Sequence, residues 1–111
     1  RIKTFYVDQL NKNSIKEMWK NIGTTKMDLI IDDGIHTLEG CITFFDYSID
    51  KLKDDGIYII EDVDPIFLNE LYGYLIQKNY IANVVRLKSS KHKLLDDNNL
   101  IIIKKINEIR N

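Results

Sequence analysis

Two short apolar runs that end in carboxylates constrain this chain most strongly. The first is Met27–Ile31, which two aspartates follow, and the second is Ile57–Ile60, which a glutamate and an aspartate follow. Short apolar runs bounded by acids and glycine are typical of buried strands in a parallel sheet. Parallel α/β sheets bind their ligands at the carboxyl ends of the strands. We therefore expect the acidic residues of both runs to meet at one edge of a sheet.

The rest of the chain alternates between apolar runs and helical patterns, which is typical of βαβ units. The other strands that we predict are Thr4–Val7, Ile81–Leu87 and Leu100–Ile103. The polar stretch Lys88–Asn99 joins the last two and has no helical pattern, so we expect these two strands to pair antiparallel. The sequence thus predicts an α/β fold with a mostly parallel sheet and an antiparallel C-terminal strand.

Three helices are predicted between these strands. Apolar residues at helical spacing form a stripe on the second (Leu38, Cys41, Ile42, Phe45, Ile49 and Leu52) and the apolar side of the third (Ile66, Phe67, Leu71, Tyr74 and Leu75). Their expected boundaries are a Ser14-x-x-Glu17 capping box and Gly23 for the first, Leu38 and Lys53 for the second, and an Asp64-Pro65 start for the third. A capping box satisfies two free amides at a helix start, and proline suits the first helical position because its missing N–H is not needed there. The segment Asp54-Asp55-Gly56 is expected to form the turn before the next strand.

Bulk composition excludes several classes of protein. At 111 residues the chain holds one domain at most, and 44% hydrophobic and 30% charged residues describe an ordinary globular protein. The net charge of -1 argues against charge-driven binding to nucleic acid or membranes. No apolar run approaches the length of a membrane span, and no signal peptide opens the chain. Cys41 is the only cysteine, so no internal disulfide forms and a cytoplasmic location is expected.

The residue types at the two strand ends suit metal-assisted chemistry. Asp33, Glu61 and Asp62 offer the hard oxygen ligands that divalent cations prefer, and His36 offers a neutral base beside them. Such a pair of metal and base can activate a substrate hydroxyl. Structural explanations stay open at the same positions. Asp32 and Asp33 together suit a turn with Gly34. Glu61-Asp62 suits the dipole of the following helix, and His36 suits a helix cap or a position at the edge of the core.

One longer pattern resembles a known family. The segment Asp-Leu-Ile-Ile-Asp-Asp-Gly-x-His, and after a helix Leu-Lys-x-x-Gly, four apolar residues and Glu-Asp, resembles the class I S-adenosylmethionine-dependent methyltransferases. It is similar in particular to the metal-dependent O-methyltransferases that modify sugars on macrolide antibiotics and to their cephalosporin-hydroxylase-like relatives. The resemblance implies a three-layer Rossmann-like fold with strand order 3-2-1-4-5-7-6.

The resemblance covers only part of that fold. Residues 1–111 would run from its third strand to its C-terminus, so the domain would be truncated at its N-terminus, and the Gly-rich cofactor loop would lie outside the chain. We then expect the 111 residues alone to be inactive. Thr4–Val7 would lack its sheet neighbours and be displaced or paired with another chain, since unpaired strand edges recruit partners and favour a homo-oligomer.

The resemblance also implies roles for individual residues. In this family the strand-end acids hold Mg²⁺, a histidine is the candidate general base, and an acid after the third strand meets the adenine ring of S-adenosylmethionine. Carried over by position, the metal ligands are Asp33, Glu61 and Asp62, the base is His36, and the cofactor-side residues are Asp8, Gln9 and Asp32. The implied reaction is methyl transfer to a hydroxyl of a small molecule, such as a sugar.

Three other readings compete with this one. Asp62-Val63-Asp64 matches the Asp-x-Asp of metal-dependent nucleotide-sugar transferases, although Pro65 and the helix-cap pattern count against it. Leu29–Asp33 resembles a Walker B strand, but the sequence contains no Gly-x-x-x-x-Gly-Lys-Ser/Thr loop. A folded domain without catalysis, acting as an interaction module, is the third alternative.

Overall fold

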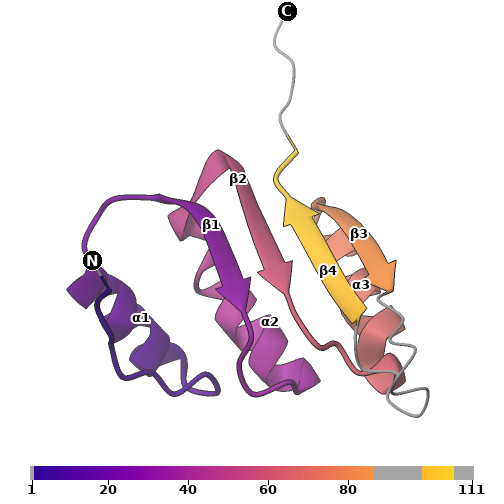
Figure 1. The fold of residues 1–111 in the computed structure, drawn as a ribbon, viewed down its shortest axis with the longest axis horizontal. Coiled ribbons are helices and arrows are strands. Elements are labelled where there is room, and N and C mark those ends of the chain that lie inside the picture. Colours follow the sequence, from indigo (N-terminus) through magenta and orange to yellow (C-terminus); the bar gives the residue numbers. More distant parts are fainter. Residues whose placement is uncertain (1, 87–98, 107–111) are drawn as a thin grey trace, which may run out of the picture.

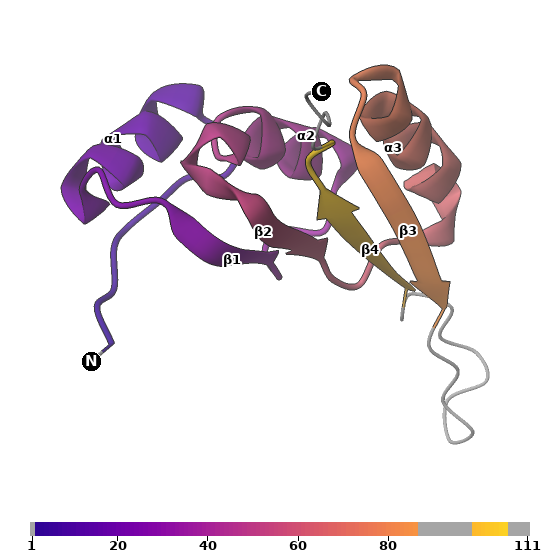
Figure 2. The ribbon, with the colours of Figure 1, turned by 90° about the horizontal axis from the view of Figure 1, so that it is seen from above.

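The chain forms one four-stranded sheet with three helices packed against a single face. The computed structural model describes residues 2–86 and 99–106. The elements, in chain order, are α1 (Lys12–Ile22), β1 (Met27–Asp32), α2 (Leu38–Asp46), the short 3-10 helix η1 (Ile49–Lys51), β2 (Leu52–Ile60), α3 (Pro65–Gln77), β3 (Ile81–Arg86) and β4 (Asn99–Lys104). Figure 1 shows the strands side by side, and Figure 2 shows all three helices on one side of them.

The sheet has the mixed topology that the sequence predicts. Its strand order is β1-β2-β4-β3. β1 and β2 are parallel, whereas β4 is antiparallel to both of its neighbours, so β3 runs in the same direction as β1 and β2. The predicted α/β class and the antiparallel C-terminal strand are therefore confirmed. The described residues supply two of the three layers that the resemblance implies, because all the helices lie on one face.

The core lies between the helices and that face of the sheet. Every second residue of β4 and of residues 56–60 in β2 points towards the helices and is buried, as in Tyr58 and Ile103. The helices contribute apolar residues at helical spacing to the same hydrophobic cluster, among them Trp19, Phe45 and Leu71. Burial of these side chains is what holds the helices on the sheet. The predicted apolar stripe of the second helix is confirmed at this interface.

The predicted strand at Thr4–Val7 is wrong. Residues 2–7 have no regular secondary structure, and of the four residues only Val7 packs against the core. A strand needs a neighbour for its backbone hydrogen bonds, and within the described residues β1 pairs on one side only, with β2. The local sequence has strand propensity, but no strand among the described residues pairs with it.

Two predicted boundaries also differ. α1 begins at Lys12 with Asn11 as its N-cap, because the Ser14 hydroxyl accepts a hydrogen bond from the Asp8 amide (2.7 Å) and is not available to cap. The second helix ends at Asp46 rather than near Lys53, and the strand that follows begins already at Leu52.

The predicted turn before the third strand is part of β2. Met27 pairs with Leu52 and Leu29 pairs with Ile57, so β2 carries extra residues between these two contacts. The turn prediction therefore located an interruption of the ladder and not the start of the strand. The two last strands pair antiparallel as predicted, from Ile81 with Lys104 onwards.

The connection between the last two strands falls outside the described residues, from Leu87 to position 98. Among the helices of the described ranges, none is long and apolar enough to cross a membrane.

Candidate active site

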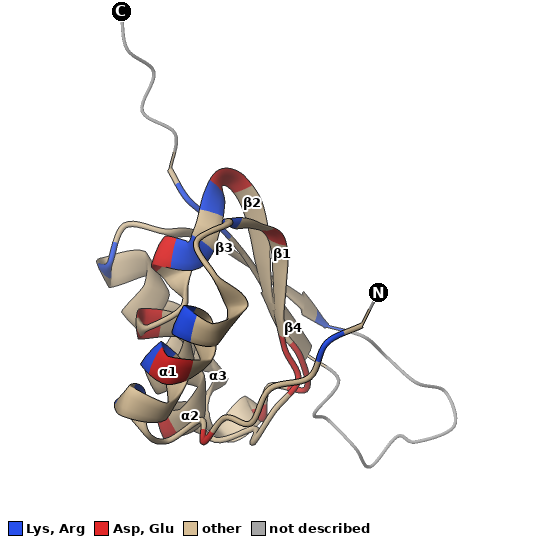
Figure 3. Cartoon of the chain, turned by 90° about the vertical axis from the view of Figure 1, so that its left-hand side faces the viewer, with Lys and Arg blue, Asp and Glu red and all other residues tan. Residues whose placement is uncertain are grey.

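The two acidic strand ends meet, as the sequence predicts, at one edge of the sheet. Asp32 is paired with Ile60 in the parallel register of β1 and β2. The next amide, that of Glu61, donates a hydrogen bond to the Asp32 carbonyl oxygen (2.9 Å), so the two chains leave the sheet side by side. Figure 3 shows the acidic residues in red along these exits. The register of two parallel strands is thus what brings distant carboxylates together.

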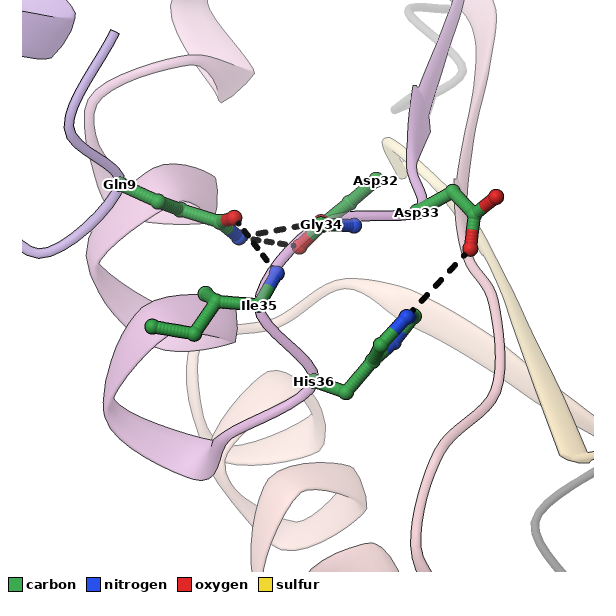
Figure 4. Close-up of polar contacts among 6 residues, drawn as sticks. All are labelled: Gln9, Asp32, Asp33, Gly34, Ile35 and His36. Atoms are coloured by element: carbon green, nitrogen blue, oxygen red, sulfur yellow. Dashed lines mark hydrogen bonds and ion pairs between the residues drawn. The ribbon is translucent and has the colours of Figure 1, made fainter.

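Three side chains form a compact group at this edge. One possible ligand atom from each of Asp33, His36 and Asp62 lies within 4.8 Å of the other two. The His36 Nε2 atom is 3.6 Å from the Asp33 Oδ1 atom (Figure 4). The side chains of His36 and Asp33 are 39% and 58% exposed, so a ligand can reach them from solvent.

The backbone at this group is unusual. His36 and Asp62 both have left-handed conformations, with φ of 57° and 54°. Residues other than glycine rarely adopt this conformation, and each instance costs about 1–3 kcal/mol. Such residues concentrate at functional sites, where the surrounding structure must hold them in place. Two of the three members of the group, His36 and Asp62, therefore have backbone conformations that lower the stability of the fold.

A second layer of polar contacts lies behind the group. Asp32 points towards the helices and is 5% exposed. Its carboxylate accepts hydrogen bonds from the Gly34 amide (3.0 Å) and from the Gln9 side-chain amide (3.0 Å to each oxygen). Burial raises the pKa of the Asp32 carboxyl above its ordinary value of 3.8, and the hydrogen bonds from Gly34 and Gln9 oppose that shift.

The remaining predicted residues lie close by but differ in their surroundings. Glu61 is half-buried and, within the described residues, is not part of the compact group. Asp8 is exposed, and its carboxylate accepts a hydrogen bond from the Leu10 amide (3.1 Å). Asp64 caps α3 by accepting from the Ile66 amide (2.9 Å). The second acid of the competing Asp-x-Asp reading is therefore engaged as a helix cap.

The donor set fits a divalent cation with a base beside it. Carboxylate oxygens are the preferred ligands of Mg²⁺, and Asp33 and Asp62 offer them from two different strand ends. A neutral imidazole is a poor ligand for Mg²⁺ but a good proton acceptor near neutral pH. The geometry therefore separates two tasks, with oxygen atoms for a cation and the His36 ring for a proton.

Comparisons with known proteins find a curated relative and solved structures with a similar fold. No protein family model matches the sequence. Over 73 residues the chain is 32% identical to the 8-demethyl-8-alpha-L-rhamnosyl tetracenomycin-C 2'-O-methyltransferase of Streptomyces olivaceus, a match that covers 66% of this chain and 19% of that protein. Two crystal structures of MycE, a methyltransferase of the mycinamycin biosynthetic pathway, share the fold. One holds Mg and SAH, and the other also holds mycinamycin VI.

The structural match extends over nearly all of the chain. It covers 93% of this chain in both cases, with 22% identity and TM-scores of 0.62 and 0.61. These matches support the predicted resemblance: the chain shares the fold of MycE, and part of its sequence is similar to that of a named O-methyltransferase. The chain spans about a fifth of the curated relative and about a third of MycE. The comparison with MycE therefore shows the fold of the sheet and its helices, and the reaction has to be argued from the residues of the site.

Sequence reasoning found the members of the compact group but missed two features. The left-handed backbone at His36 and Asp62 was not predicted, because neither position is a glycine, the residue that adopts this conformation most readily. The contact between Gln9 and Asp32 joins residues that are far apart in the sequence. The one hint was Gly34, whose missing side chain leaves room for the Gln9 amide.

Proposed function

We propose that this chain is the metal-binding part of an S-adenosylmethionine-dependent O-methyltransferase that acts on a hydroxyl group of a small molecule. The observation that carries the proposal is the convergence of Asp33, His36 and Asp62 at the ends of two parallel strands. The relatives support it, since one is named as a sugar O-methyltransferase and MycE was crystallised with Mg and SAH. A glycosylated natural product is the acceptor class that these relatives favour.

In this proposal Asp33 and Asp62 hold Mg²⁺, and Glu61, next to Asp62 at the same strand end, is the third ligand. When bound, the cation lowers the pKa of a substrate hydroxyl and orients its oxygen. His36 lies 3.6 Å from Asp33 and accepts the proton that this hydroxyl loses.

The cofactor side of the proposal is less complete within this chain. Asp8, exposed at the loop before α1, is proposed to meet the adenine ring. The resemblance also implies a cofactor-side role for Gln9 and Asp32, but their side chains bond to each other (3.0 Å) and Asp32 is 5% exposed. The sequence contains no Gly-x-Gly loop to cradle the rest of S-adenosylmethionine. We therefore propose that residues 1–111 are a partial methyltransferase domain that binds the cation but does not transfer a methyl group alone. A cytoplasmic location and pairing of the β1 edge with a second copy belong to the same proposal.

Calorimetric titration of the 111-residue chain with MnCl₂ and MgCl₂ tests the cation site. We expect binding by the wild type and at least a tenfold loss of affinity in Asp33→Asn and Asp62→Asn, since each variant removes one charged ligand. Asp50→Asn is the matched control, because Asp50 is an exposed acid that contacts Lys51 and lies outside the group. His36→Gln is expected to keep most of the affinity for Mg²⁺.

Two outcomes contradict the proposal. Wild-type protein that binds neither cation has no metal site, and equal losses in Asp50→Asn and Asp33→Asn show only a general effect of charge. Adding S-adenosylmethionine to the same titration tests the partial-domain proposal, which expects no binding of that cofactor to this chain.

A further inference from the structure

We propose that Gln9 is a positioning residue for the metal site, holding the segment Asp32–His36 in the conformation that aims Asp33 and His36 at Asp62. The inference rests on the proposed function, since it concerns the same cation. It departs from the role that the resemblance implies for Gln9, because the side chain is turned to the protein's own loop (Figure 4).

Both ends of the Gln9 amide are engaged on this segment. Its Nε2 atom donates to the two carboxylate oxygens of Asp32 (3.0 Å each) and lies 3.3 Å from the Gly40 carbonyl oxygen. Its Oε1 atom accepts from the Ile35 amide (3.0 Å). The Ile35 amide directly precedes His36, so one side chain ties the loop at its first residue and again just before its last.

The chemistry of these contacts selects a glutamine. A carboxylate needs a donor and an amide N–H needs an acceptor, and a side-chain amide offers both from one planar group. Glutamate at position 9 would set a second carboxylate against the buried Asp32, where like charges repel strongly. Leucine has a similar size but offers neither contact.

The loop sequence leaves space for this side chain. A Cβ atom on Gly34 would overlap Gln9 Oε1, lie 3.0 Å from Gln9 Cδ and lie 3.2 Å from Asp32 Oδ1. Gly34 is not among the residues with positive φ, so it is the room for Gln9 that requires a glycine here. Gly34 and Gln9 therefore form one structural device, in which the glycine leaves the space that the glutamine side chain fills.

The device acts where the backbone needs support. His36 is held at φ of 57°, a conformation that persists only when its surroundings enforce it. Residues that orient metal ligands from behind typically change metal affinity by about 10–100-fold when removed. We expect loss of the Gln9 amide to act in the same way on Asp33 and His36.

The test compares Gln9→Leu with Asn11→Ala in the full chain, with Mn²⁺ as the probe in calorimetry. Asn11 caps α1 two residues away, and both of its side-chain hydrogen bonds come from amides in the first turn of that helix. Both variants lose stability, and only Gln9→Leu is expected to lose about tenfold in Mn²⁺ affinity. Gly34→Ala, which displaces the Gln9 side chain, is expected to reproduce that loss. Exchange of the Ile35 amide, followed by NMR, is expected to accelerate in Gln9→Leu and in Gly34→Ala but not in Asn11→Ala.

The outcomes separate this inference from the proposed function. Wild-type protein that binds no Mn²⁺ overturns both. Wild-type binding with equal affinity in Gln9→Leu, or an unchanged Ile35 exchange rate, overturns the role of Gln9 and leaves the metal site standing. Equal losses in Gln9→Leu and Asn11→Ala also overturn it, because the effect is then one of general stability.

Discussion

The buried hydroxyl group of Tyr58 offers a sharp test of how this core is packed. Tyr58 lies in β2 with no exposed surface, and its ring meets Phe45 edge to face at 5.1 Å between centroids. Among the described residues, no group forms a hydrogen bond with its hydroxyl. A buried polar group without a partner costs about 1–3 kcal/mol, because water satisfied it in the unfolded chain. We therefore predict that Tyr58→Phe makes the protein more stable.

The size of the gain follows from two opposing terms. Removing the oxygen relieves the desolvation cost of about 1–3 kcal/mol, and it loses a few van der Waals contacts of about 0.1–0.2 kcal/mol each. The net expectation is a free energy of unfolding higher by about 1 kcal/mol. In a domain of this size that raises Tm by roughly 4 °C. Urea unfolding measures the gain directly, as a higher midpoint with an unchanged m value.

Tyr74→Phe is the matched control for the same chemical change. The Tyr74 hydroxyl donates to both carboxylate oxygens of Asp46, at 2.7 and 2.6 Å, so its removal is expected to lower stability by about 1 kcal/mol. The two variants should therefore shift the urea midpoint in opposite directions. If Tyr58→Phe is destabilised as much as Tyr74→Phe, the Tyr58 hydroxyl has a partner in solution and the reasoning fails.

Three further predictions concern the stability of the fold. Burial raises the pKa of the Cys41 thiol from 9.0 to about 12. The stability that comes from keeping this thiol protonated is therefore fully present below pH 9 and is lost as the pH rises through 12. Urea unfolding at pH 8 and about pH 10.5 should show this loss in the wild type and a smaller one in Cys41→Ala. Gly73→Ala, in α3 and with no described atom within 4 Å of the new Cβ, should gain about 0.5–1 kcal/mol. Gly56→Ala, whose Cβ would lie 2.6 Å from Leu52 Cδ1, should lose about 1–3 kcal/mol in the same assay, and a gain there would contradict the tight packing at β2.

The sequence predicted best where a pattern reports burial directly. The apolar stripe of α2 and the Asp64-Pro65 start of α3 are local signals, and both are confirmed. Within α3 the pattern is less exact: Ile66 is 90% exposed, whereas Leu68 is buried. Helical spacing fixes which residues share a face, but the tilt of the helix on the sheet decides which of them are covered.

The failures came from interactions between distant residues. Thr4–Val7 has the composition of a strand, and pairing with another strand is not written in a local pattern. Asn11 and Ser14 are both residue types that cap helices well. Asn11 is the N-cap here, because the Ser14 hydroxyl accepts a hydrogen bond from the Asp8 amide. The strand ends at Asp33 and Asp62 were predictable because parallel pairing itself brings them together.

The two left-handed residues explain how this site combines distant chain segments. His36 follows Ile35, whose amide is held by Gln9, and Asp62 precedes Val63, whose amide and carbonyl both bond to the buried Asn99. Each left-handed residue is thus next to a residue that is hydrogen-bonded from outside the loop. Ile35 is held by the Gln9 side chain, and Val63 is held by the side chain and the backbone of Asn99. Strained residues relax unless neighbouring contacts enforce them. The anchors at Gln9 and Asn99 are therefore as much a condition of the Asp33–His36–Asp62 group as the strand register that brings its members to one edge.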